Sequence, residues 1–262
     1  MAAASVTASG LHTLEPGPSP DHRAATAATA PSSVPVQRPA EPSASRPPTA
    51  RPTKRPPTPR AGTPSKKPST TPSRVPKGCS RGRIALTFDD GPDVQTRQVL
   101  RVLKRFDVRA TFFVTGSKAT ADPAAIRAIH REGHHVQNHS WSHPDLTGLS
   151  AEQIRRELID TQRAVAAAGV PAPAVFRPPF GASNATVETE VERLGLRTLR
   201  WSIDSFDWRG GTPQEIAATV LKGLRRDGVV LMHDGVRNSV NTARALPLII
   251  DGLQRRGFCT AG

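Results

Sequence analysis

After residue 78 the sequence alternates short apolar runs with amphipathic segments about seven times, and this alternation restricts the fold more than any other feature. Runs such as 110–116 and 229–233 are rich in β-branched or aromatic residues, which is typical of buried strands. The segments between the runs, such as 96–106, carry their apolar residues on one helical face. Strands that are apolar on both faces and joined by helices form parallel sheets covered by helices. The sequence therefore predicts an α/β fold.

Two of the predicted helices have strong start signals. Ser150 with Gln153, and Thr212 with Glu215, match the capping-box pattern, in which each residue's side chain accepts a hydrogen bond from the other's backbone. Between these helices, apolar and polar residues alternate over 197–204, which predicts one continuous strand.

Composition divides the chain near residue 78. Residues 1–77 consist mostly of Pro, Ala, Ser, Thr, Arg and Lys and contain no Phe, Trp or Tyr. Such a segment cannot bury enough apolar surface to offset its conformational entropy, so we expect a disordered, basic, Pro-rich linker over 1–77 and one folded domain over 78–262. Residues 1–78 carry eleven Lys or Arg and three Asp or Glu, which is +8 of the formal charge of +14. We interpret this charge as that of an extended spacer, and weak attraction to polyanions is the alternative.

Titratable residues gather where the predicted strands end. In a parallel (β/α) barrel those ends meet on one face, where the active site is built. We therefore expect an irregular (β/α) barrel of about seven parallel strands rather than an open sheet. The residues at these strand ends are Asp89, Asp90, His139, His143, Arg177, Asp204, Asp207 and His233.

His139 and His143 are four residues apart, the spacing that brings two side chains to one side of a helical turn. With a carboxylate from another strand they would make a two-histidine, one-carboxylate metal site. Either feature alone is weak, because most such histidine pairs are ordinary core or surface residues and adjacent aspartates before Gly-Pro are common in turns. Ser140 stands where a zinc protease of the HExxH type has its glutamate, so that class is disfavoured.

Five ordered motifs together resemble the polysaccharide deacetylases, the NodB-homology family also known as carbohydrate esterase family 4. The resemblance covers about Ile84 to Cys259 and leaves out the linker. The motifs are Thr87-Phe88-Asp89-Asp90-Gly91-Pro92, His139-Ser140-Trp141-Ser142-His143, Arg177-Pro178-Pro179-Phe180-Gly181, Asp204-Ser205-Phe206-Asp207-Trp208 and Leu231-Met232-His233.

The resemblance implies a metal-dependent hydrolase. One divalent metal ion, Zn²⁺ by expectation with Co²⁺ or Mn²⁺ as alternatives, would be held by Asp90, His139 and His143. Asp89 would be the general base, and His233 the general acid that protonates the departing amine.

The resemblance also implies supporting roles around these groups. Asp204 would orient His233, and of Asp204 and Asp207 the sequence favours Asp204 for this role; Arg177 would pair with Asp89. The backbone N–H of Phe180 would stabilise the oxyanion, although the family often has Tyr at this position. Trp208 and Leu231 would wall a small pocket for the acetyl methyl group.

The activity that the resemblance implies is removal of acetyl from N-acetylglucosamine units of chitin, chitooligosaccharide or peptidoglycan. An acetylxylan esterase with the same site, and a glycan-binding module that has lost catalysis, are the alternatives. A third class, a nucleic-acid or cell-surface binder driven by the basic linker, predicts strong salt dependence. The linker lacks the aromatic residues of single-strand binding platforms, so we expect an acetylated glycan as partner, no specific nucleic acid, and a monomer.

Export is left open by the N-terminus, which lacks the basic start and apolar core of a signal peptide. No run of 18 apolar residues predicts a membrane span. Cys79 and Cys259 are the two cysteines, and we expect them to form a disulfide in an exported protein and to remain thiols in cytosol. From the family and this bridge we expect a secreted or cell-wall-associated protein.

Overall fold

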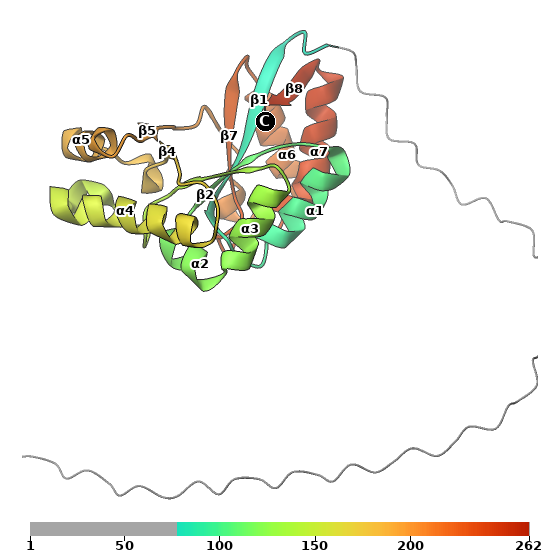
Figure 1. Cartoon of the computed structure of the whole chain (residues 1–262). Helices are drawn as coiled ribbons and strands as arrows, with labels where there is room; N and C mark the ends of the chain where they lie inside the picture. The colour runs from blue at the N-terminus through green and yellow to red at the C-terminus, as the bar shows by residue number, and fades with distance from the viewer. Residues whose placement is uncertain (1–77, 262) are drawn as a thin grey trace, which may run out of the picture. The chain divides into compact units, whose positions relative to one another are not determined.

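A computed structural model of the protein describes residues 78–261. The linker predicted over residues 1–77 lies outside the described residues. The described chain is an α/β domain of parallel strands and surrounding helices (Figure 1). The strands are β1 (Gly82–Gly91), β2 (Thr111–Val114), β3 (His135–Asn138), β4 (Val175–Phe176), β5 (Arg197–Thr198), β6 (Ile203–Asp204), β7 (Gly228–His233) and β8 (Phe258–Ala261). The helices are α1 (Thr96–Phe106), α2 (Gly116–Ala121), α3 (Pro123–Arg131), α4 (Ala151–Ala167), α5 (Ala185–Arg193), α6 (Pro213–Lys222) and α7 (Thr242–Arg255).

Seven strands form a curled half-barrel in the order β5-β4-β3-β2-β1-β7-β6, and every pair is parallel. This confirms the predicted irregular barrel of about seven parallel strands. β1 is the longest strand and lies between β2 and β7 (Figure 1). One side of β1 pairs with β7, while the other side pairs with β2 near its end and with the additional strand β8 near its start.

The two faces of β1 have different surroundings because successive side chains point in opposite directions. Ile84, Leu86 and Phe88 belong to the main core, which they share with α1 and α7. Thr87 and Asp89 point to the other face, where Arg177 contacts both. The alternation along β1 therefore separates an apolar layer beneath the helices from a polar barrel interior.

The continuous strand expected over 197–204 is wrong in one respect. β5 pairs with β4, and β6 pairs with β7 at the opposite edge of the sheet, so residues 199–202 cross between the two edges. The backbone N–H of Leu199 still bonds Phe176, and that of Ser202 bonds Val229. Apolar and polar residues still alternate over 197–204, because β5 and β6 at its two ends are both extended. The two strands nevertheless belong to opposite edges of the sheet.

Local signals fix several helix ends as expected. Both predicted capping boxes are present, at the start of α4 and of α6. The short helix α2 was not predicted, and it follows β2 directly. None of the helices among residues 78–261 has the length and apolarity needed to cross a membrane.

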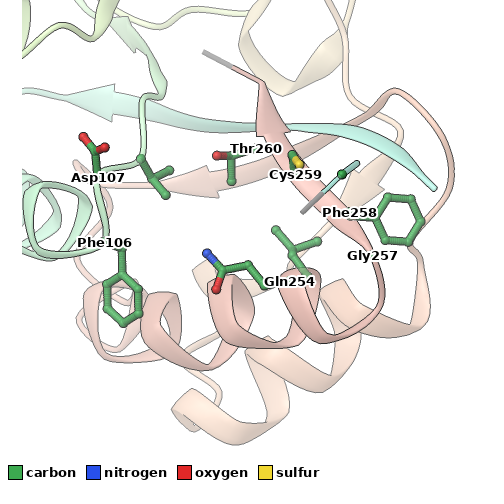
Figure 2. A pocket seen from close by; sticks show the side chains of 10 residues that line it. Phe106, Asp107, Gln254, Gly257, Phe258, Cys259 and Thr260 are labelled. Atoms are coloured by element: carbon green, nitrogen blue, oxygen red, sulfur yellow. The ribbon is translucent and has the colours of Figure 1, made fainter. Parts of the chain in front are cut away.

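A disulfide joins Cys79 to Cys259, as expected for an exported protein, and links the residues before β1 to β8. A cavity of about 200 Å³ lies beside this bridge. Phe258 and Thr260 of β8 and Gln254 of α7 are among the residues that line it (Figure 2). β8 pairs with the first residues of β1, so the cavity lies at the opposite end of that strand from Asp89 and Asp90.

Candidate active site

Asp89 and Asp90 end β1, and their neighbourhoods differ. The Asp89 carboxylate is buried, and its Oδ1 lies 2.8 Å from Nη1 of Arg177. Asp90 has a left-handed backbone (φ 70°), which turns the chain before the cis peptide bond between Gly91 and Pro92. The two adjacent carboxylates therefore reach the same cavity with different partners.

Arg177 is fully buried in the barrel interior and holds several elements together. Its Nη1 donates to Thr87 at 2.7 Å as well as to Asp89, and its Nε donates to the Leu199 carbonyl at 3.1 Å. Its guanidinium carbon lies 4.1 Å from the centre of the Phe113 ring. The predicted pairing of Arg177 with Asp89 is therefore present, inside the barrel.

Asp90, His139 and His143 form the one group among residues 78–261 whose donor atoms suit a metal ion, with all donors within 4.8 Å of one another. Asp90 Oδ1 lies 3.2 Å from Nε2 of each histidine, yet it is buried without a hydrogen-bond partner among the described residues. Burial raises the pKa of Asp90, but contact with His139 and the nearby histidine charges outweigh it, so the pKa lies well below its ordinary value. An anionic oxygen and two imidazole nitrogens around an unsatisfied position fit a first-row divalent ion.

The backbone orients both histidines. Nδ1 of His139 lies 2.7 Å from the Arg177 carbonyl, to which it donates, so Nε2 is the atom that faces Asp90. The loop from His139 to His143 is not the helical turn that their spacing suggested, because Ser140 and His143 have positive φ angles of 64° and 61°. Ser140 Oγ accepts from the His143 N–H at 3.0 Å, and Glu157 of α4 accepts from the backbone of Trp141 and Ser142.

His233 ends β7 and pairs with Asp207, not with Asp204. Its Nδ1 lies 2.7 Å from Asp207 Oδ1, and Asp207 Oδ2 accepts from the His233 backbone N–H at 2.8 Å. Asp204 instead accepts from the Phe206 N–H at 2.8 Å. The expectation for Asp204 is therefore wrong, because the chain turns after β6 and carries Asp207 behind the imidazole.

The environment of His233 favours its protonated form. Burial lowers the pKa of His233, but the hydrogen bond to Asp207 and the charges of Asp207, Asp89 and Asp90 raise it to about 9. At neutral pH the imidazole therefore carries a proton on the nitrogen that does not face Asp207.

A cavity of about 470 Å³ joins these groups and contains all the predicted substrate-contacting residues. Phe180 lies over His143, with ring centres 4.6 Å apart, and its side chain is 70% exposed. Trp208 and Leu231 line the cavity, as does Asp204. Trp201, for which the sequence predicted no role in the site, lines it as well.

Asp234 is a buried acid that the sequence analysis missed. Its carboxylate accepts from Thr96 Oγ1, and its backbone N–H donates to the Asp89 carbonyl at 3.1 Å. Burial raises the pKa of Asp234 to about 7. The turn that contains Gly91, after β1, and the turn that contains Gly235, after β7, pack directly against each other. A Cβ at Gly235 would collide with the Asp90 carbonyl, and one at Gly91 would lie 2.5 Å from the Asp234 carboxylate.

Comparison with known proteins matches this fold and site to one family. The polysaccharide deacetylase family profile matches residues 77–199. A chitooligosaccharide deacetylase of Bradyrhizobium sp. is 37% identical over 188 residues, covering 67% of this chain and 86% of that protein. A peptidoglycan-N-acetylglucosamine deacetylase of Listeria monocytogenes is 40% identical over 185 residues, covering 70% of this chain and 38% of that protein.

A solved structure agrees with the sequence comparisons. A family 4 carbohydrate esterase from Streptomyces lividans, in complex with acetate, has a TM-score of 0.65 and 37% sequence identity. The similarity covers 69% of this chain and 92% of the esterase. The chain belongs to the polysaccharide deacetylase family, as its motifs suggested.

Proposed function

We propose that the protein is a metal-dependent hydrolase that removes the N-acetyl group from N-acetylglucosamine units of a polysaccharide. Peptidoglycan and chitin or chitooligosaccharide are the substrate classes, in keeping with the names of its relatives. The observation that carries this proposal is the position of Asp90, His139 and His143 in one cavity with two further acid–base groups, Asp89 and His233.

Asp90, His139 and His143 would hold one divalent ion, with Zn²⁺ expected from two imidazole ligands and Co²⁺ or Mn²⁺ as alternatives. When bound, the ion would polarise the acetyl carbonyl and lower the pKa of water. The Arg177 carbonyl supports this assignment because it fixes the His139 ring with Nε2 toward Asp90.

Asp89 acts as the general base. It accepts a proton from the attacking water, whose oxygen bonds to the acetyl carbon. The buried guanidinium of Arg177 donates to Asp89 Oδ1, which fixes the carboxylate and leaves Oδ2 as the oxygen free to take the proton.

His233 acts as the general acid. It donates its proton to the sugar nitrogen as the C–N bond breaks, and the products are acetate and a free amine. Asp207 is the positioning residue that orients the imidazole through Nδ1 and stabilises its positive charge.

Phe180, Trp208 and Leu231 bind the substrate around the acetyl group. The Phe180 backbone N–H stabilises the oxyanion, a role that its left-handed conformation (φ 58°) allows by turning the chain beside His143. Trp208 and Leu231 give the acetyl methyl group an apolar wall.

Acetate release tests this proposal directly. Metal-stripped protein is assayed with and without added Zn²⁺ on peptidoglycan, chitooligosaccharide and acetylxylan. Metal-dependent release from an N-acetyl substrate supports the proposal, and release from acetylxylan alone favours the esterase. No release from protein shown to bind zinc contradicts catalysis and favours a glycan-binding module.

The wider organisation is also part of the proposal. Residues 1–77 serve as a basic linker ahead of the deacetylase domain, and the protein works as a monomer outside the cell or at the cell wall. The disulfide supports an oxidising compartment.

A further inference from the structure

Two exposed aromatic rings and an arginine form a compact group beside His233 and its partner Asp207. The Phe206 and Trp208 ring centres are 6.3 Å apart, and the Arg209 guanidinium carbon lies 4.4 Å from the first and 4.7 Å from the second. Phe206 is 40% exposed and Trp208 is 39% exposed. We call these three residues the Arg209 platform.

The backbone beneath the Arg209 platform is well anchored. Asp207 lies between the two aromatic residues and is fully buried, with bonds to His233 and to Thr242 Oγ1 at 2.5 Å. Gly210, which ends this turn, adjoins Asn238 in the loop after β7. The platform is thus fixed relative to His233. Trp208 belongs both to the platform and to the lining of the cavity that contains His233.

The charge of Arg209 has no carboxylate partner in the part of the chain that the structure describes. No carboxylate among residues 78–261 lies within ion-pair distance of Arg209 or of Arg237, an exposed residue in the loop that adjoins Gly210. By contrast, Lys118 on the other side of the metal-binding residues pairs with Asp93 at 2.9 Å. Positive charge without a partner therefore lies on the His233 side of the cavity.

We propose that the Arg209 platform is a subsite for a carboxylate-bearing sugar next to the N-acetylglucosamine that is deacetylated. The rings offer apolar surface to a sugar face, and the guanidinium fork matches a carboxylate with two parallel hydrogen bonds. This inference rests on the proposed function and narrows its substrate class to an anionic glycan. Peptidoglycan strands without their stem peptides fit, because their N-acetylglucosamine alternates with a sugar that carries a free lactyl carboxylate, whereas chitin is neutral.

The test compares two oligosaccharides of equal length, one from peptidoglycan with free carboxylates and one from chitin. The variant Arg209→Gln removes the charge, and Arg101→Gln, an exposed arginine of α1 outside the cavity, is the matched control. Arg209→Gln should lower kcat/KM for the anionic oligosaccharide by roughly ten-fold or more, with a change within about two-fold for the neutral one. Arg101→Gln should change neither, and added salt should weaken the preference of the unaltered protein.

Binding is measured separately by calorimetry in an Asp89→Asn background, where turnover is not needed. The Arg209 substitution should weaken binding of the anionic oligosaccharide by a similar factor. An equal effect on both oligosaccharides, or none on either, would overturn the subsite. Absence of acetate release together with Arg209-dependent binding would instead overturn the proposed function and support the subsite.

Discussion

Nδ1 of His233 lies 2.7 Å from Oδ1 of Asp207, and Asp207 also accepts from the His233 backbone N–H. A single buried carboxylate thus fixes both the ring and the end of β7. The charged groups that face His233 are Asp207 from the turn after β6 and Asp89 and Asp90 from β1, and all three favour the imidazolium.

Asp207→Asn should return the His233 pKa from about 9 toward its ordinary value near 6.5. The imidazolium would then lose its proton before pH 8, so deacetylation at pH 8 should fall by about ten-fold or more. NMR titration of the metal-free protein measures the pKa, and acetate release against pH measures the rate. Asp204→Asn is the matched control and should leave the His233 pKa almost unchanged; a larger effect at Asp204 would contradict this pairing.

Asp89→Asn should reduce kcat by about 10²- to 10⁴-fold, because the amide cannot accept the proton of the attacking water. Zinc content, measured by elemental analysis after dialysis, should stay near that of the unaltered protein, since Asp89 is not among the three proposed ligands. Near-normal turnover in this variant would show that the general base lies elsewhere.

His143→Ala should lose both the metal and the activity. The substitution removes one of three donor atoms and leaves Asp90 and His139 as an incomplete site. The loss of metal separates this variant from Asp89→Asn in the same elemental analysis. Full zinc occupancy in His143→Ala would remove this histidine from the ligand set.

Asp234 should make stability fall as pH rises toward 7. Its folded-state pKa of about 7 lies above the unfolded value near 3.9, so between these values the native state binds the proton more tightly. The resulting decrease in the free energy of unfolding develops above about pH 4 and is complete once pH exceeds 7. Urea unfolding of metal-free protein should show Asp234→Asn gaining stability relative to the unaltered protein as pH rises; parallel pH profiles would refute the assignment.

Replacing Cys79 and Cys259 together by Ser should lower the melting temperature by roughly 5–15 °C, which corresponds to about 2–5 kcal/mol. The bridge spans 180 residues, so its loss frees a long loop in the unfolded chain. Because the bridge lies at the opposite end of β1 from Asp90, kcat well below the melting temperature should change little. A selective loss of kcat without a change in melting temperature would contradict a purely structural bridge.

The sequence predicted most of the sheet because strand periodicity and helix caps are local properties. The run ending in Asp89 and Asp90 and the capping box at Ser150 needed no knowledge of distant residues. The division of 197–204 between β5 and β6 could not be predicted, because hydrogen-bond partners on two different strands decide it.

The sequence predicted which motifs form the site, but not which residue of each motif makes a given contact. Asp204 and Asp207 stand in the same motif, and only the turn between them decides which reaches His233. Asp234 follows His233 directly, and nothing in the sequence predicted that its carboxylate is buried. The burial depends on contact with the turn after β1, which is far away in the sequence. His134 is likewise buried without any sign of this in the sequence, and its Nδ1 accepts a hydrogen bond from the Ala110 N–H.

The interlocked turns at Gly91 and Gly235 have an evolutionary consequence. Each glycine makes room for a group of the other turn, so a side chain gained at Gly91 would displace Asp234 and one gained at Gly235 would displace the backbone of Asp90. Neither glycine can be replaced alone without moving the other turn. A tolerated substitution at one position would therefore require a compensating substitution in the other turn. Divergence among homologues should therefore show strong epistasis between these two positions, although 144 residues separate them along the chain.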